Sequence, residues 1–398
     1  MSRRAREGHG LYGVKVFDFD RTKGDYLVPE EMAGVDPDVV AQPPATNSTY
    51  SSRSVAVFVI DCRSHKTPWK KGLAAYYGDL DGDFLGERQW RWLETALSRS
   101  RASVNIVVNG LQVHANIFPD GNVAEAWGRY PRAQQRLFDA MLQENVEAPI
   151  LISGDVHMAQ FMRKDCTSRQ HGTKNTHPLI EMTTSGMTHS WGTLDAKRLV
   201  NPVPTTWQEW FESLVASSMM RLLHTVCPWT DLMVSESRQK LSWSSDKYEN
   251  GGMDGAKTGK QYSLQRNFGE LEFDWDEGTV SMRVMGEDES RSPLLAAKWT
   301  LDQLSGRVHM PGGKVTERDY LQAQQERGNA SGEWTCVSYR GRASFVDLLA
   351  GYTTTGLALV LLVPFPFLLP TYMLLHLIRR YLRRSKVHPL DSGVSKMR

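Results

Sequence analysis

The sequence of 398 residues contains only four cysteines, and they lie far apart. They are Cys62, Cys166, Cys227 and Cys336. None of the short C-x-x-C spacings typical of zinc clusters or thioredoxin-like redox sites is present, so the cysteines predict neither. An even number allows one or two disulfides in a secreted domain and equally allows four reduced thiols. The sequence therefore leaves the cysteine pairing open.

The sequence also lacks an excess of charge of either sign. It has 47 basic and 45 acidic residues, for a formal net charge of +2. A global electrostatic field that would attract nucleic acid is therefore absent, and we expect no nucleic-acid-binding surface. No G-x-S-x-G elbow or Walker loop occurs, which removes two common signatures of hydrolases and nucleotide-binding proteins. The oligomeric state is left open.

Long apolar runs are missing from the N-terminus, where the basic start MSRRAREGHGLYGV is not followed by a signal-peptide core. Residues 351–378, by contrast, contain no Asp, Glu, Lys or Arg and exceed the roughly 20 residues that span a bilayer. This run predicts a transmembrane helix, in which prolines are better tolerated than in water. A helix buried in the protein core is the alternative.

The charges that flank this run predict its orientation. Residues 379–398 begin with a cluster of arginines and a lysine, and basic flanks lie on the cytoplasmic side of a span. We therefore expect a basic cytoplasmic tail and a large N-terminal part that is lumenal or extracellular. Glycosylation triplets at Asn47 and Asn329 agree with this placement, although each is a weak signal alone.

The first half of the chain alternates between strand-like and helix-like patterns. Short β-branched runs are separated by segments with apolar residues at helical spacing, in the order 54–61, 85–100, 103–110, 131–146 and 148–155. A further strand is expected at 179–186 after a polar loop. Strands that alternate with helices predict an α/β domain, in which helices pack on a sheet.

The second half is less regular. Residues 196–259 predict an amphipathic helix followed by a Gly-rich loop and are interpreted as an insertion or lid. Within residues 260–304, alternating apolar and polar residues on either side of a DEGT turn predict a β-hairpin that returns to the edge of the sheet. Residues 305–350 are polar and predict a linker or stalk.

The stretch PILISGDVH ends an apolar run with two potential metal ligands, Asp155 and His157. Ligands of α/β sheets gather beyond the carboxyl ends of strands. In an extended segment the two side chains would project to the same side, and a carboxylate with an imidazole suits Fe, Mn, Zn or Ca. A buried aspartate bonded to backbone N–H groups, with a structural histidine beside it, explains the same residues.

Two further residues close predicted strands. His189 follows the strand at 179–186, where it is either a site residue or a loop histidine. Arg63 follows the strand at 54–61, where a guanidinium can bind phosphate oxygens through two parallel hydrogen bonds, although an exposed arginine is the commoner outcome.

Taken together, segments of the chain resemble PhoD-like alkaline phosphatases, a branch of the calcineurin-like metallophosphatases. The resemblance covers most of residues 10–285 and rests on the order of eight segments: GLYGVKVF, VFVIDCRSHK, DFLGERQWRWLE, NGLQV, EAWGRYPRAQQRLF, ILISGDVHMAQF, EMTTSGMTHSW and NFGELEFDWD.

The resemblance implies a calcineurin-like αββα sandwich, with residues 1–195 as the C-terminal portion of a phosphatase domain. It implies hydrolysis of phosphomonoesters or phosphodiesters by metal ions, iron and calcium in this branch, with zinc or manganese as possible substitutes. Asp155 and His157 carry over as metal ligands. His189 and Arg63 match recurrent positions and are expected to be catalytic.

The chain departs from the family pattern before GLYGVKVF, where the family's early Asp and Gly-Asp metal motifs are missing. Asp155 and His157 alone are too few ligands for two ions. We therefore expect a membrane-anchored phosphatase fragment with weak or no activity by itself. The alternative is an inactive membrane-anchored remnant that acts as a binding or scaffold protein.

Overall fold

The computed structural model of the chain separates into two units, Met1–Ala343 and Ser344–Arg398. We treat each unit by itself. The structure describes residues 10–20, 52–70, 79–115, 125–168, 176–188, 190, 262–263, 265–286, 293–308, 333–338, 371–372 and 374–379.

The first unit is built on an eight-stranded mixed sheet in the order β1-β2-β3-β4-β6-β5-β11, with β7 paired to β5. Strands β2, β3, β4 and β6 pair in parallel, whereas the outer strands β1, β5 and β11 pair antiparallel to their neighbours. The bounds are β1 Gly13–Asp18, β2 Ser54–Val59, β3 Val104–Val108, β4 Pro149–Ser153, β5 Ala159–Ser168, β6 Thr176–Thr184, β7 Tyr262–Ser263 and β11 Trp334–Ser338.

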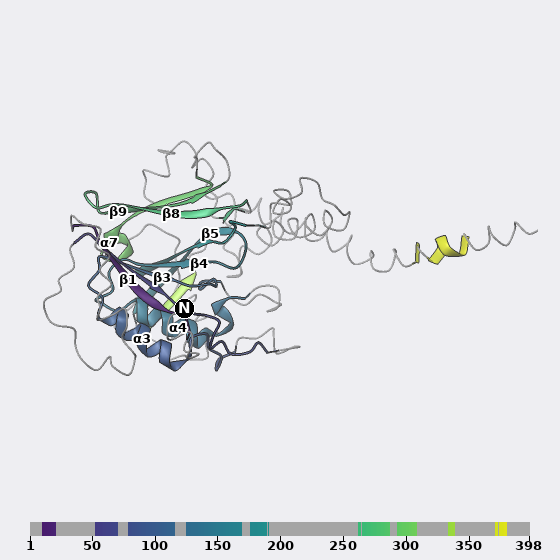
Figure 1. Ribbon diagram of the computed structural model, residues 1–398, viewed down its shortest axis with the longest axis horizontal. Helices are drawn as coiled ribbons and strands as arrows, with labels where there is room; N and C mark the ends of the chain where they lie inside the picture. Colours follow the sequence, from purple (N-terminus) through teal and green to yellow (C-terminus); the bar gives the residue numbers. More distant parts are fainter. Residues whose placement is uncertain are drawn as a thin grey trace, which may run out of the picture. The chain divides into compact units, whose positions relative to one another are not determined.

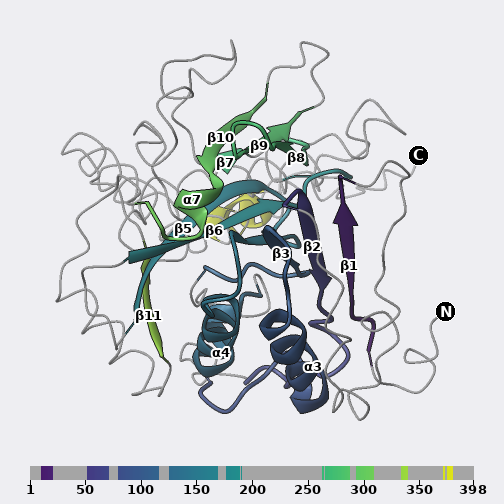
Figure 2. The ribbon, with the colours of Figure 1, turned by 90° about the vertical axis from the view of Figure 1, so that its left-hand side faces the viewer.

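Two helices cover one face of this sheet (Figure 2). Helix α3 (Gly86–Ser98) connects β2 to β3, and α4 (Pro131–Met141), preceded by the short helix η2 (Trp127–Arg129), connects β3 to β4. Both helices form where the sequence predicts them, because apolar residues three and four apart make one buried stripe on each. Leu93 and Leu137 pack there against Leu151 of β4 in one apolar core.

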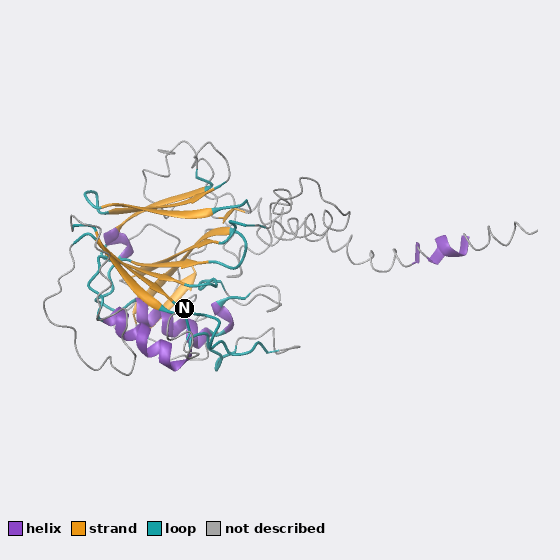
Figure 3. Ribbon diagram, in the orientation of Figure 1, coloured by secondary structure: helices purple, strands orange, loops and turns teal. Residues whose placement is uncertain are grey.

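A second sheet of three strands lies over the other face (Figures 1 and 3). Its strands are β8 (Phe268–Asp274), β9 (Thr279–Met285) and β10 (Leu295–Thr300), followed by the short helix α7 (Leu301–Leu304). Ile150, next to Leu151 in β4, belongs to the core that Met282 and Trp299 share between the sheets. Adjacent strand residues therefore serve opposite cores, as the alternation of side chains requires.

The arrangement is a helix layer, a large sheet and a smaller sheet, which confirms the expected α/β class. The hairpin expected within residues 260–304 is confirmed as β8 and β9, which turn at Gly278 with a positive φ of 62°. Its placement differs from the prediction, however. The hairpin does not extend the large sheet but pairs with β10, a strand that sequence reasoning missed.

Four strands of the large sheet were not predicted, namely β1, β5, β7 and β11. Strand β5 carries Arg163, Lys164 and Asp165 in its centre, and these charges led us to expect a polar loop; the structure buries all three, with Arg163 Nε 2.7 Å from Asp165 Oδ1. Strand β11 falls in the range 305–350 that was expected to be a linker or stalk. The edge of β5 accepts β11 as a partner, so at least this part of the range belongs to the sheet.

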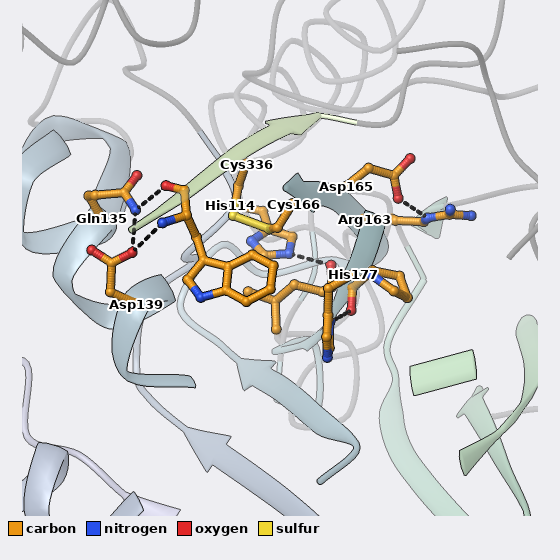
Figure 4. The surroundings of a disulfide bond; sticks show 11 residues. His114, Gln135, Asp139, Arg163, Asp165, Cys166, His177 and Cys336 are labelled. Carbon is orange, nitrogen blue, oxygen red and sulfur yellow. Dashed lines mark hydrogen bonds and ion pairs between the residues drawn. A yellow bond between two sulfur atoms is a disulfide. The ribbon is translucent and has the colours of Figure 1, made fainter. Parts of the chain in front are cut away.

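A disulfide between Cys166 and Cys336 fixes β11 to β5, where the two cysteines are directly opposite each other (Figure 4). On the other side, α4 holds the backbone of Trp334. Gln135 Nε2 donates to the Trp334 carbonyl at 2.6 Å, and Asp139 Oδ1 accepts from the Trp334 N–H at 3.0 Å (Figure 4). The pairing that the sequence left open is thereby Cys166–Cys336, while Cys62 is free and buried.

In the second unit, the structure describes residues 371–372 and 374–379, which are helical and expose Tyr372, Leu374, Leu375, Leu377 and Ile378. Within the part of the chain that the structure describes, no helix reaches the length and apolarity needed to cross a bilayer. Most of the run at 351–378 lies outside the described residues, as do the basic tail from residue 380 onward, the insertion at 196–259, Asn47, Asn329 and Cys227.

Replacing both bridge cysteines in the variant C166A/C336A is expected to lower the free energy of unfolding by about 3 kcal/mol. The loss has a physical reason: the bridge closes a loop across a sequence separation of 170 residues and so restricts the unfolded chain. Urea unfolding would measure it. A reducing agent should destabilise the wild type and the control C62A, but not the double variant; equal unfolding midpoints for wild type and double variant under oxidising conditions would contradict the bridge.

Candidate active site

The carboxyl ends of the parallel strands lie along one edge of the large sheet. The residues after β2, β3, β4 and β6 meet there, because consecutive parallel strands are in register, with Val59 beside Val108 and Val108 beside Ile152. This edge is where α/β sheets usually bind their ligands. The predicted site residues in VIDCR and SGDVH fall on it.

Strand β4 stops at Ser153, and the GDVH segment bends immediately. Asp155 and His157 both have left-handed backbones, with φ of 71° and 56°. The expectation of an extended segment that projects both side chains to one side is therefore wrong. Non-glycine residues rarely adopt this conformation, and its energetic cost is typical of segments held in place for binding or catalysis.

Arg63 joins the ends of β2 and β4. One of its terminal nitrogens, Nη2, is 3.2 Å from Asp155 Oδ1, and the two side chains are 54% and 37% exposed. Burial raises the pKa of Asp155 above its ordinary value, and the positive charge of Arg63 opposes this effect. The structure thus brings together two of the four predicted site residues.

His157 and His189 are less closely defined. His157 is half-buried and near enough to act electrostatically on Asp155, and its backbone carbonyl accepts a hydrogen bond from Ser190 Oγ at 2.8 Å. That bond connects the GDVH bend to the segment after β6. His189 itself lies outside the described residues, so its expected role stays a prediction.

Asp61, which sequence reasoning did not select, organises the loop that carries Arg63. Its carboxylate accepts hydrogen bonds from the backbone N–H groups of Arg63 and Ser64 and from the Ser64 hydroxyl, at 2.6 to 3.0 Å, and from the Leu11 N–H at 2.7 Å. Burial would raise the pKa of Asp61, but these bonds outweigh it and lower the pKa to about 2. An aspartate two residues before a loop arginine was the signal available in the sequence.

Glu125 is a second residue that the sequence reading missed. It receives hydrogen bonds from Arg63, from Trp69 Nε1 and, at 2.5 Å, from Lys66 Nζ. Burial would raise the pKa of Glu125, but the bonds from Lys66, Trp69 and Arg63 outweigh it, so the pKa lies below its ordinary value. Arg63 therefore bridges two carboxylates, those of Glu125 and Asp155.

Beneath the strand ends lies a buried polar network around Glu181 of β6. Its carboxylate accepts hydrogen bonds from Ser153 Oγ and from the backbone N–H groups of Val113 and His114, at 2.5 to 2.8 Å. Burial raises the pKa of Glu181 to about 7, although each of these bonds opposes the shift. The network holds the segment after β3 against the ends of β4 and β6.

Other polar residues at this edge are structural. His114 is buried, with Nε2 2.8 Å from the Leu179 carbonyl, and Asn109 Oδ1 accepts from the Leu111 N–H at 2.9 Å and from Trp127 Nε1 at 3.2 Å. Burial raises the pKa of the Cys62 thiol to about 12, so Cys62 does not supply a thiolate nucleophile.

The described residues do not fit a metal cluster. Among them, no three or more histidine, cysteine, aspartate or glutamate side chains are grouped so that they could hold an ion. The nearest candidate, Asp155, is paired with Arg63, and the carboxylate of Asp61 is already occupied by four hydrogen bonds. Asp155 and His157 alone leave a metal ion short of protein ligands.

Comparison with known proteins finds a matching family. The family model of the PhoD-like phosphatases matches residues 50–217. Among solved structures, the chain is similar to one described as "Structure of PhoD", with 16% identity, 39% of this chain and 32% of that chain covered, and a TM-score of 0.27. The chain thus spans about a third of the length of that relative. No curated protein shows significant similarity.

The matched range contains Arg63, Glu125, Asp155, His157 and His189. The match supports the assignment of residues 50–217 to the PhoD-like phosphatases, a family of metal-dependent phosphatases, as the order of the segments indicated. This assignment rests on the sequence match.

Raising the pH from 4.5 to 7 is expected to reduce the contribution of Glu181 to stability by about 3 kcal/mol. In the unfolded chain Glu181 ionises near 4.5, whereas in the folded protein it stays protonated up to about 7. The stabilisation is therefore complete below 4.5 and is lost as the pH rises through 7. Denaturant unfolding of wild type and E181Q at several pH values would measure how steeply the free energy of unfolding of each protein changes with pH.

Half-buried His177, whose pKa burial lowers to about 4, contributes to stability with the opposite pH dependence. Because His177 is present in both wild type and E181Q, its contribution cancels in the comparison, which therefore isolates Glu181. E144Q, which replaces an exposed glutamate, is the control, and its free energy of unfolding should depend on pH as that of the wild type does. Parallel pH profiles for wild type and E181Q would contradict the assignment.

Proposed function

We propose that this chain forms part of the active site of a phosphatase that hydrolyses phosphomonoesters or phosphodiesters. The observation that carries the proposal is the Arg63–Asp155 contact, at 3.2 Å, between the ends of two parallel strands in the segment that the family model matches. Arg63 is half-exposed at this edge. A guanidinium in such a place binds phosphoryl oxygens and offsets the negative charge that develops during phosphoryl transfer.

Metal chemistry enters the proposal only through the family. Since the described residues do not fit a metal cluster, further ligands must come from residues outside the described ranges or from another polypeptide, and Asp155 and His157 contribute to that set. Iron and calcium are the metals proposed by resemblance, with zinc or manganese as alternatives. The role of His189 is likewise proposed from its position in TTSGMTHSW.

The chain by itself is expected to hydrolyse p-nitrophenyl phosphate slowly, because its set of metal ligands is incomplete. D155A should lower this residual rate by about tenfold or more. The assay would be run with iron, calcium, zinc and manganese supplied in turn. The matched control is D302A, which breaks another exposed Asp–Arg pair, between Asp302 of α7 and Arg307 after it, at 3.0 Å.

Three outcomes are informative. Rapid turnover that D155A abolishes would contradict the incomplete site, and turnover unaffected by D155A would contradict the site itself. No hydrolysis above the uncatalysed background with any metal would favour the second candidate, a catalytically inactive protein that binds phosphate esters or serves as a scaffold. The Arg63–Glu125 and Arg63–Asp155 pairs supply that candidate with a binding group but no chemistry.

Membrane anchoring through residues 351–378 is part of the same proposal, with the phosphatase domain outside the cytosol. The absence of charged residues in this run, the helical and exposed apolar residues from Leu374 to Ile378, and the arginines that follow support it. The Cys166–Cys336 disulfide supports an oxidising compartment for the domain.

Expressed in cells, the full chain should stay with membranes during carbonate washing and be released by detergent, because an inserted helix is held by the hydrophobic effect. A variant that ends at residue 343 is the control and should be released by carbonate. Digestion with an N-glycosidase should increase the mobility of the wild type but not of N47Q/N329Q. Release of the full chain without detergent would rule out the span.

A further inference from the structure

The loop after β2 at residues 61–70 presents three different hydrogen-bond donors to a single carboxylate. We call these residues the donor loop. Its guanidinium of Arg63, ammonium of Lys66 and indole N–H of Trp69 all donate to Glu125, with Lys66 Nζ 2.5 Å from Oε1. Lys66 and Glu125 are largely buried, with side chains 17% and 19% exposed, whereas Arg63 is 54% exposed. The cluster is thus open to solvent on the Arg63 side.

Lys66 and Trp69 of the donor loop are also held in place by contacts that do not involve Glu125. Trp69 stacks on Tyr130, with ring centroids 5.0 Å apart, and Lys66 Nζ lies 4.2 Å from the Trp69 ring centroid. Thr67 is bonded through its backbone N–H to the Asp83 carbonyl at 2.8 Å and through its hydroxyl to the Asp83 N–H at 2.9 Å. Removing the Glu125 carboxylate would therefore leave the donors close to their present positions.

The Asp61 turn fixes the other end of the donor loop. Two hydrogen bonds to the Asp61 carboxylate set the backbone of Arg63 and Ser64. The Asp61 backbone is itself bonded to Gln89 of α3, through its N–H at 2.8 Å and its carbonyl at 3.0 Å. Preorganised donors of this kind bind an oxyanion without paying for reorganisation. A loop that only needed Glu125 as a structural anchor would not require this independent support.

Two positive charges and one N–H donor suit a tetrahedral oxyanion better than a single carboxylate. A phosphoryl group has three peripheral oxygens and up to two negative charges, so it can occupy all three donors at once. Glu125 supplies two oxygens and one charge. The cation–π contact between Lys66 and Trp69 keeps the ammonium partly desolvated, which strengthens its interaction with an anion.

We propose that Arg63, Lys66 and Trp69 form a binding site for the phosphoryl group of a substrate, and that Glu125 is an internal counter-ion which the substrate displaces. The inference rests on the proposed phosphatase function in one respect: it identifies the anion as a phosphoryl group. Arg63 connects this site to the strand-end site, since its other terminal nitrogen is 3.2 Å from Asp155. Lys66 and Trp69 thereby gain a direct role in substrate binding.

The test is the binding of inorganic phosphate to the full chain, measured by titration calorimetry at pH 8 with a chelator to remove metal ions. E125Q keeps the shape of the side chain and removes the competing charge, so it should bind phosphate about tenfold more tightly than the wild type. E144Q removes the same charge from an exposed site at the opposite edge of the sheet and should bind like the wild type.

Two further variants identify the donors. In the E125Q background, K66M and W69F should each reverse most of the gain, because each removes one donor and retains much of the side chain's volume. E125D shortens the counter-ion and should give an intermediate affinity, and it provides the same comparison if E125Q folds poorly. Circular dichroism and thermal unfolding would establish that every variant is folded.

The proposal is overturned if folded E125Q and E125D bind phosphate no more tightly than the wild type, or if K66M leaves the affinity of E125Q unchanged. Because phosphate binding needs no turnover, these outcomes are independent of the phosphatase assay. A gain in affinity without any hydrolysis would support the binding site and count against the proposed catalytic function. Hydrolysis of the phosphate ester without a gain in phosphate affinity would support the proposed catalytic function and count against the binding site.

Discussion

The parallel pairing of β2, β3, β4 and β6 is the constraint on which the rest of the domain depends. It aligns four strand ends at one edge, so that Arg63 after β2 lies within hydrogen-bond distance of Asp155 after β4, although 92 residues separate them in sequence. Each parallel connection needs a crossover, and α3 and α4 supply two of them on the same face of the sheet. The opposite face is then free for the small sheet, which completes the second core.

The edge at the strand ends is polar, and its main polar groups have hydrogen-bond or ion-pair partners within the protein itself. Glu181 accepts three hydrogen bonds in the interior, Asp61 accepts four at the surface, and Arg63 lies between Glu125 and Asp155. Buried polar groups without partners are costly, so these networks also hold the loops in one arrangement. The left-handed backbones of Asp155 and His157, by contrast, cost free energy. Such strain is commonest where a segment is held in place for binding.

Local signals predicted the centre of the fold but not its edges. The strands around Val55, Ile106 and Ile150 are apolar on both sides because both faces of the sheet are covered, and this pattern is readable in sequence. Strand β5 was missed because Arg163 and Lys164 read as exposed, and β11 because its stability comes from a disulfide and from α4 contacts that are remote in sequence. Arg63 and Asp155 were each selected from the sequence, but their contact was not predicted. Glu125 offered no sequence motif, since it is defined only by the three donors that surround it.

The carboxylates at the strand ends are already paired with cationic side chains among the described residues. Arg63 neutralises Asp155, the carboxylate that the family resemblance assigns to a metal, and Lys66 with Arg63 neutralises Glu125. An ion bound by Asp155 and an anion bound by the donor loop would each have to replace one of these pairs. Displacing Glu125 would leave Arg63 between the bound anion and Asp155. The guanidinium would then couple the binding of an anion by the donor loop to the binding of a metal ion by Asp155. In the proposed site, the positions of Arg63 and Asp155 would therefore link substrate binding to metal binding through the Arg63 side chain.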